Sequence, residues 1–111
     1  MRSLIAAACL TLVLACARAT IDMQASVLTP SGALPDTIDC NRPLVVKAGT
    51  ESQGVAAERE WIDTQYPGHS RYSQALVADK GRKFDILRFN AADGRAISVC
   101  FDITSFFGKW E

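Results

Sequence analysis

The fold is decided at residues 96–103, which read Ala-Ile-Ser-Val-Cys-Phe-Asp-Ile. Apolar and polar side chains alternate along this segment, which is typical of a β-strand with one buried face. Ile97, Val99 and Phe101 share the apolar face, where we expect the core to pack. The same pattern places Cys100 on the opposite face of the strand.

Two further strands are predicted upstream of this segment. Residues 72–79 alternate loosely, and residues 83–90 are rich in Phe, Ile and Leu. The turn sequences Asp-Lys-Gly-Arg and Ala-Asp-Gly separate the three strands, and their glycines supply positive φ. The three strands are therefore expected to form an antiparallel meander. On its polar face, Asp102 and Arg88 are predicted to form a cross-strand ion pair.

A helix is predicted before the meander. Thr50 and Gln53 have the spacing of a capping box, in which the two side chains satisfy the first backbone N–H groups. The Pro-Gly pair at 67–68 ends the helix. The apolar face is expected to consist of Val55, Ile62 and Tyr66, with Trp61 flanking it.

This order of elements predicts an α+β domain over residues 42–111. One helix packs on a three- to four-stranded antiparallel meander, and one disulfide cross-links the domain. Residues 44–47 form a short β-prone run before the helix. Residues 20–41 are predicted as an extended N-terminal arm, in which alternating apolar residues allow one or two short added strands.

The N-terminus has the layout of a secretory signal peptide spanning residues 1–19. Arg2 is followed by an uncharged apolar run over residues 4–14, and Ala17 and Ala19 provide small residues before a cut at Thr20. The apolar run is too short to cross a bilayer core of about 30 Å as a helix. We therefore predict an exported protein, periplasmic or extracellular, without a membrane span.

A second processing site is present within the same segment. Residues 13–16 read Val-Leu-Ala-Cys, which has the form of a loose bacterial lipobox. Cleavage there would leave Cys16 as a lipid-anchored first residue instead of a free Thr20.

Cysteine content agrees with export. Four cysteines are present, and Cys40 and Cys100 are the two that follow the signal peptide. An even pair in an oxidising compartment predicts one disulfide. The loop it closes, of about sixty residues, corresponds to a stabilisation of about 4 kcal/mol in the chain-entropy model.

Charge argues against a nucleic-acid partner. The chain has 12 basic and 12 acidic side chains, and removing residues 1–19 takes away two arginines and no acid. The mature chain is then slightly acidic, with no basic footprint. We expect no cofactor and no metal site. The chain has a single His, and its two remaining cysteines are predicted to form a disulfide, so only carboxylates would be left as metal ligands.

Part of the chain resembles a known family. The order helix, Tyr66-Pro67-Gly68, strand, Gly-containing turn, strand, Asp93-Gly94 and strand with Asp102 is similar to the PepSY-like group of small exported domains. The resemblance covers residues 50–104. It implies a periplasmic or extracellular binding or inhibitory module, often tied to peptidases, and it brings no catalytic residues to carry over.

Two groups of residues are candidates for binding. The loop after the helix holds His69, the only histidine, with Arg71 and Tyr72 close behind it. A histidine titrates near neutral pH, so this loop could serve a small hydrolase or a ligand-binding protein. The second group is the aromatic cluster near the C-terminus: Phe106, Phe107 and Trp110. These rings either close the open end of the core or form a partner-binding patch.

The sequence leaves three classes of function open. The first is a non-enzymatic exported module, a monomer that binds a protein or peptide partner in the cell envelope through a sheet edge or the aromatic cluster. The second is the small hydrolase or ligand-binding protein that would use the His69 loop. The third is a structural envelope lipoprotein anchored at Cys16.

Overall fold

The computed structural model describes residues 19–22 and 28–110, apart from the side chains of Arg71 and Tyr72. The predicted signal-peptide body and Cys16 lie outside the described residues. The elements are β1 (Thr20–Asp22), β2 (Thr37–Ile38), β3 (Leu44–Lys47), α2 (Glu51–Gln65), β4 (Ser70–Asp79), β5 (Arg82–Asn90) and β6 (Ala96–Asp102).

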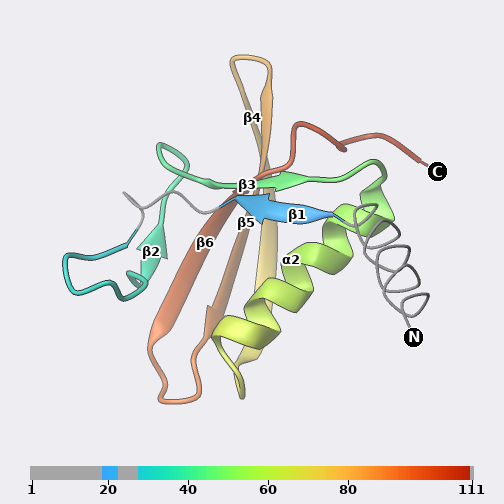
Figure 1. Cartoon of the computed structure of the whole chain (residues 1–111). Helices are drawn as coiled ribbons and strands as arrows, with labels where there is room; N and C mark the ends of the chain where they lie inside the picture. The colour runs from blue at the N-terminus through green and yellow to red at the C-terminus, as the bar shows by residue number, and fades with distance from the viewer. Residues whose placement is uncertain (1–18, 23–27, 111) are drawn as a thin grey trace, which may run out of the picture.

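These strands form one mixed sheet against which α2 packs (Figure 1). The strand order is β1-β3-β6-β5-β4, and β2 pairs with β6 outside this path. The α+β class and the antiparallel β4-β5-β6 meander agree with the sequence prediction. The sheet is larger than the predicted three to four strands and is not purely antiparallel, since six strands take part and two pairings are parallel.

The parallel pairings arise because β6 takes its second neighbour from the N-terminal part of the chain. Residue Thr37 of β2 lies opposite Ser98, and Leu44 of β3 lies opposite Phe101. Arg95 holds the start of this segment, since its Nη1 lies 2.6 Å from Oδ1 of Asp36. Two short segments therefore share one edge of β6, an arrangement that no local pattern encodes.

The predicted disulfide is confirmed. Cys40 lies in the connection between β2 and β3, and it is bonded to Cys100 of β6 with a Cα–Cα distance of 5.3 Å. The cross-link therefore runs along the edge of β6 and fastens the β2–β3 connection to the centre of the sheet.

Helix α2 begins as predicted but presents a different face. The Thr50 side chain accepts a hydrogen bond from the Gln53 backbone N–H at 3.3 Å. The Gln53 side chain reaches back one residue further than expected, to the N–H of Gly49. The buried helix residues are Gly54, Glu58 and Ile62. The predicted place of Val55 in the core is wrong, because the helix is rotated so that Gly54 can lie against an aromatic ring.

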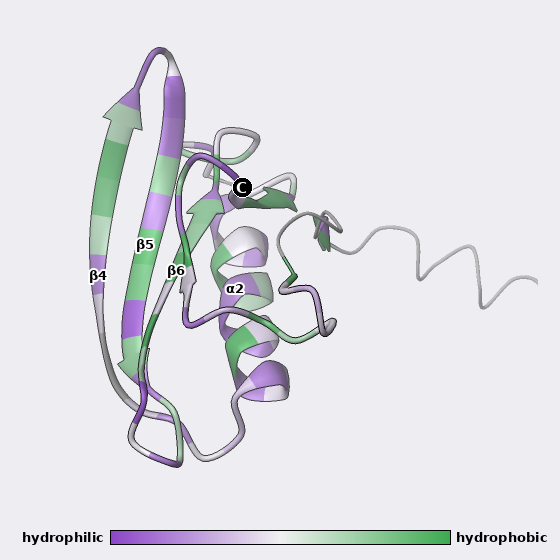
Figure 2. Ribbon diagram, turned by 90° about the vertical axis from the view of Figure 1, so that its left-hand side faces the viewer, coloured by the Kyte–Doolittle hydropathy of each residue, from purple (hydrophilic) through white to green (hydrophobic). Residues whose placement is uncertain are grey.

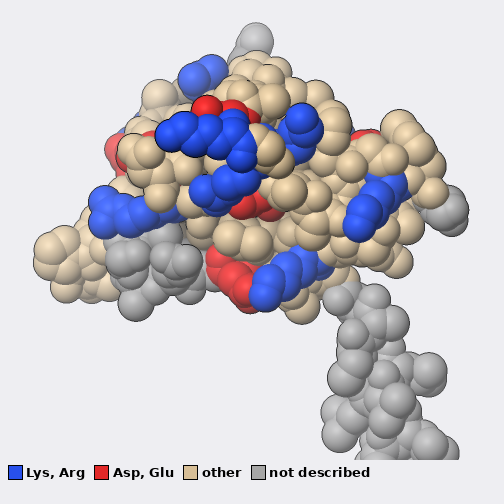
Figure 3. All heavy atoms as spheres, turned by 90° about the horizontal axis from the view of Figure 1, so that it is seen from above, with Lys and Arg blue, Asp and Glu red and all other residues tan. Residues whose placement is uncertain are grey.

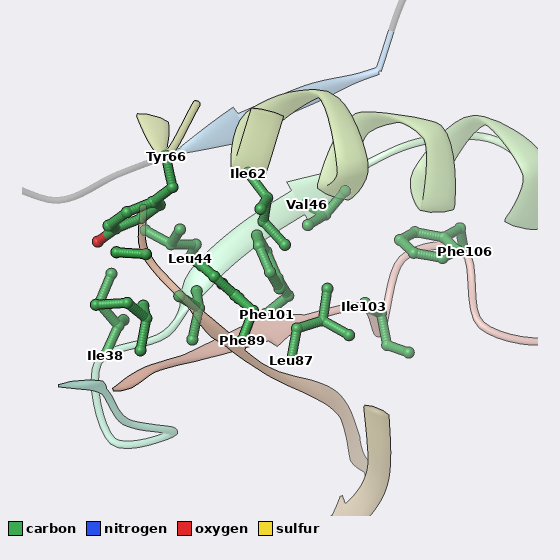
Figure 4. Close-up of a cluster of buried hydrophobic side chains, with 13 residues drawn as sticks. Ile38, Leu44, Val46, Ile62, Tyr66, Leu87, Phe89, Phe101, Ile103 and Phe106 are labelled. Atoms are coloured by element: carbon green, nitrogen blue, oxygen red, sulfur yellow. The ribbon is translucent and has the colours of Figure 1, made fainter. Parts of the chain in front are cut away.

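The core lies between α2 and the strands β3, β6 and β5 (Figure 4). Ile97, Val99 and Phe101 of β6 are all buried, as their alternation predicts. The largest contributions from the other elements are aliphatic and aromatic, and include Leu44, Val46, Ile62, Leu87, Phe89 and Phe106. Phe106 reaches the helix from the segment after β6, so that segment closes one end of the core.

The β4–β5 hairpin projects beyond the helix-covered part of the sheet (Figure 1). Its two-residue turn consists of Lys80 and Gly81, whose φ values are 51° and 81°. Positive φ at both positions is characteristic of the turns that match the right-handed twist of a hairpin. The predicted turn at 79–82 is thus confirmed, and β4 is left as an outer strand of the sheet.

Candidate functional site

The loop after α2 places His69 against the end of the helix. Its Nδ1 lies 2.9 Å from the Tyr66 carbonyl oxygen, and its backbone N–H donates to the same oxygen. The ring also meets Phe89 edge-on, with the ring centres 5.4 Å apart. The Nε2 atom is 3.7 Å from a carboxylate oxygen of Asp63, which is longer than a hydrogen bond. These contacts make His69 part of the helix terminus.

The other candidates in this loop are described only in part. Arg71 and Tyr72 lie in β4, near its start, where the pairing register with β5 shifts between Ser70 and Tyr72. Their side chains lie outside the described part of the structure, so the predicted binding role of this pair has no geometry to support it.

The C-terminal aromatic cluster divides between core and surface. Phe106 is buried, with 2% of its surface exposed. Phe107 is 41% exposed and Trp110 is 78% exposed. Phe106 therefore closes the core as one alternative predicted, whereas Phe107 and Trp110 remain at the surface.

Three hydrogen bonds fix the course of the segment that carries these rings. The Gly108 N–H donates to a Glu51 carboxylate oxygen at 2.7 Å, and the Glu51 N–H donates to the Lys109 carbonyl at 2.8 Å. Nearer the sheet, the Ser105 hydroxyl donates to the Val46 carbonyl at 2.9 Å. Phe107 is thereby held beside the projecting hairpin, even though the ring is partly exposed.

An apolar hollow lies where Phe107 meets the hairpin. It has a volume of about 120 Å³. Its lining combines the edge strand, its neighbour and the C-terminal segment: Leu76, Val77, Ala78, Lys83, Phe84 and Phe107. Leu76 and Val77 are 60% and 39% exposed, which is high for large aliphatic residues in a strand. Figure 2 shows this apolar stretch on the half of β4 nearest the turn.

The backbone of β4 is open beside this hollow. Asp79 and Arg82 flank the two-residue turn and form its hydrogen-bonded pair, and such pairs alternate along an antiparallel ladder. The backbone groups of Gln74, Leu76 and Ala78 therefore point away from β5. No strand pairs with this side of β4 among the residues that the structure describes. The result is an unpaired edge next to exposed apolar side chains, which is a template for strand addition.

Basic side chains surround the same end of the molecule. Figure 3, which looks onto the hairpin, shows Lys and Arg side chains gathered there with a few acidic groups between them. Arg82 is paired with Asp102 at 2.7 Å. The Lys83 ammonium lies 5.6 Å from the centre of the Phe107 ring, at the margin of the hollow.

The ion pair of Arg82 corrects one prediction from the sequence. Asp102 lies opposite Phe84 in the sheet, whereas Arg88 lies four residues further along β5, opposite Ser98. The predicted Asp102–Arg88 pair is therefore wrong, because the register keeps the two side chains apart. Burial raises the pKa of Asp102, but the hydrogen bonds from Thr104 and Arg82 outweigh it and hold that pKa below its usual range.

Arg88 instead contributes to a larger and more polar hollow on the sheet face opposite α2. This hollow has a volume of about 550 Å³, and Thr37, Ser73, Asn90 and Ser98 supply polar groups to its walls. It is wide and open to solvent, and the described residues that line it include no carboxylate and no histidine. We find no set of groups in it that would perform acid–base chemistry.

A pair of buried carboxyl groups joins α2 to the sheet. Glu58 and Asp85 are each 2% exposed, and one oxygen of each has no hydrogen-bond partner among the described residues. Burial first, then the hydrogen bond with Asp85 and its charge, raise the pKa of Glu58 to about 9. Glu58 is therefore protonated at neutral pH and shares its proton with Asp85. Since both side chains are enclosed by the core, a substrate in solution cannot reach them.

The edge of β4 is thus the best-defined candidate site, and the sequence pointed to it only in general terms. A sheet edge and the aromatic cluster were each predicted as binding surfaces, but the roles of Leu76 and Val77 were not. The signal that could have found them is the run of four consecutive apolar residues, 75–78, within a strand that is expected to alternate.

The chain was compared with known proteins at the levels of family, sequence and structure. No family model, no curated protein and no solved structure matches it. Within the described ranges, no group of three or more His, Cys, Asp or Glu side chains could hold a metal ion. No described helix is long and apolar enough to span a membrane.

Proposed function

We propose that this chain is a small non-enzymatic module that binds an extended segment of another protein along the outer edge of β4. The observation that carries the proposal is the unpaired backbone of Gln74, Leu76 and Ala78 beside an apolar hollow. In strand addition, main-chain hydrogen bonds supply affinity, and pockets for alternate side chains supply specificity. The β4 edge offers both within a few residues of each other.

We further propose that the protein acts after export. Residues 1–19 have the charge, length and small residues of a cleaved signal peptide. The Cys40–Cys100 bond supports the same compartment, since disulfides persist in oxidising surroundings. Cleavage before Thr20 would release the chain at the first residue of β1, whereas processing at Cys16 would leave three residues between the lipid-bearing cysteine and that strand.

An inhibitory role is the more specific form of this proposal. It comes from the resemblance of residues 50–104 to PepSY-like domains, which implies modules that are often tied to peptidases. A segment bound along β4 would be held extended, which is also how peptidases engage a chain. The β4 edge supports the binding step of such a role and leaves the identity of the partner open.

Site-specific photo-crosslinking in the producing cells tests the binding function. A photoreactive amino acid replaces Leu76 at the open edge or, as the control, Ala56 on the exposed face of α2. We expect a discrete protein adduct from position 76 and none from position 56. Absence of an adduct at position 76, or equal adducts at both positions, would contradict the proposal.

A further inference from the structure

We propose, on the basis of the function above, that the segment added to β4 is acidic and places one branched aliphatic side chain in the hollow beside Phe107. Three features of the hairpin end carry this proposal. They are the size and lining of the hollow, the charge around it, and the alternation of side chains in a bound strand.

The hollow fits a single apolar side chain. Its volume of about 120 Å³ is slightly below that of engineered apolar cavities of about 150 Å³ that bind benzene. Phe84, which is 4% exposed, lies opposite Val77 in the β4–β5 ladder and contributes to the lining of the hollow. Phe107 adds the wall on the C-terminal side. A leucine or valine side chain would bury these exposed groups, whereas a polar one would find no partner among them.

The charge around the hollow is basic. Lys83 is the charged residue among those that line the hollow, and Lys80 stands in the turn of the same hairpin, next to Asp79. Arg82 is already paired with Asp102, so the lysines supply most of the charge available to a partner. Lys83 stands at the margin of the hollow itself, over the Phe107 ring. A segment with carboxylates beside its apolar anchor complements this surface, and a basic segment is repelled by it.

Spacing defines which positions of the partner meet the lysines. Side chains two residues apart in a strand point to the same face. Carboxylates two positions before and two positions after the anchor therefore lie on the face that carries the anchor and Lys83. The expected ligand motif is an acid, any residue, Leu or Val, any residue, and an acid, in an extended segment without proline.

Three synthetic heptapeptides test this motif on the full mature chain. The first is Thr-Glu-Thr-Leu-Thr-Glu-Thr, the second replaces both Glu by Lys, and the third replaces Leu by Ala. Amide hydrogen exchange and chemical shifts, followed by NMR, report where and how tightly each peptide binds. We expect the first peptide to bind about tenfold or more tightly than the other two and to weaken as salt screens the lysines. Exchange should slow at Gln74, Leu76 and Ala78, which point outward, and not at Ala75 and Val77.

Variants assign the preference to its residues. The double change Lys80→Glu and Lys83→Glu should make the Lys peptide bind more tightly than the Glu peptide. Arg88→Glu, on the opposite sheet face, should leave the order of the two affinities unchanged. Phe107→Ala should reduce the difference in binding affinity between the Leu and Ala peptides. Circular dichroism of each variant shows whether it is folded.

The outcomes separate this inference from the function on which it rests. If the Glu and Lys peptides slow amide exchange at β4 equally, the acidic motif is overturned, while the proposal of strand addition is still supported. No protection by any peptide, together with an adduct at position 76 in cells, overturns the motif alone. If the β4 amides are protected from hydrogen exchange without peptide, and this protection grows with protein concentration, a second copy of the chain occupies the edge. Binding to vesicles of phosphatidylglycerol without peptide-dependent protection shows a membrane surface instead. Either of these last two results overturns the inference.

Discussion

The protonation state of Glu58 is coupled to the stability of the fold. Its pKa of about 9 lies far above the ordinary value of 4.5, chiefly because the side chain is buried. The folded state therefore keeps a proton that the unfolded state releases above pH 4.5. Stability is linked to this difference and falls as pH rises from about 4.5 to about 9.

Replacing Glu58 by Gln should remove this pH dependence. The amide is neutral at every pH and can still donate to Asp85, so the core no longer requires a bound proton. We expect the wild-type free energy of unfolding to fall by about 1 kcal/mol per pH unit between pH 5 and pH 8 relative to Glu58→Gln. Urea unfolding at several pH values measures this. Glu60→Gln, an exposed change on the same helix, should retain the wild-type slope; a common slope for all three chains would contradict the assignment.

Gly54 is required by the ring that lies against it. A Cβ built at this position would be 2.3 Å from Cζ of Phe106. Alanine favours a helix over glycine by about 1 kcal/mol, but overpacking a core costs about 1–3 kcal/mol. We expect Gly54→Ala to lower the thermal midpoint and to displace Phe106 toward solvent.

Gly54→Ala should cost less stability in a Phe106→Leu background than in the wild type, because the smaller leucine side chain leaves room for the added methyl group. Ala56→Gly, on the exposed side of the helix, provides the reference for helix propensity. If Gly54→Ala is as stable as the wild type, the close contact between helix and ring is not maintained in solution.

At the scale of elements, β4 offers a test in which neighbouring prolines have opposite consequences. Proline lacks an N–H and is tolerated in a strand where that N–H faces solvent. Ala78→Pro should therefore keep the chain folded, with a small loss of stability, and should abolish the adduct at position 76. Val77→Pro removes an N–H that bonds to β5 and should destabilise the hairpin more than Ala78→Pro does. Circular dichroism melts and the crosslinking yield distinguish the two variants. If Ala78→Pro were the more destabilising change, the N–H of Ala78 and not that of Val77 would bond to β5.

The cross-link between the β2–β3 connection and β6 should be a large part of the stability. We expect reduction, or the double change Cys40→Ala/Cys100→Ala, to cost about 2–5 kcal/mol, as is typical for a small domain. Thermal melts with and without dithiothreitol measure the loss. An unchanged midpoint would show that the short strands hold their places through pairing alone.

The elements that could be predicted from the sequence are those with local signals. The apolar face of β6, the turn at Lys80–Gly81 and the cap at Thr50 are confirmed. The other face of β6 is less exposed than its alternation predicts, since Cys100 and Asp102 are also buried. The parallel places of β2 and β3 could not be predicted, because strands of two and four residues carry no periodicity that identifies their partner.

The buried face of α2 was misjudged for a different reason. Its centre is Gly54, which has no side chain, and Glu58, which carries a carboxyl group, and neither is counted as apolar in a helical pattern. The same limit applies to the candidate site. A loose alternation shows that β4 is a strand, but its position as an outer strand depends on which strands pair elsewhere.

At the scale of the whole molecule, the processing of the N-terminus decides whether the domain diffuses freely. We expect the exported chain to begin at Thr20 and its intact mass to be lower than that of the reduced form by two hydrogens. Mass spectrometry and N-terminal sequencing check both points. A blocked, lipid-modified Cys16 would replace the free form, and two free thiols would contradict the disulfide in the native protein.

The central place of β6 also determines when the chain can fold. This strand follows every other strand in sequence, yet it lies between β3 and β5 and also receives β2. Until residues 96–102 are available, β3 has no partner on that side and the apolar face of α2 has no complete surface to pack on. A nascent chain therefore cannot complete the sheet or its core before β6 has been made. For the export that we propose, this order means that the sheet can close only after residues 96–102 have crossed the membrane.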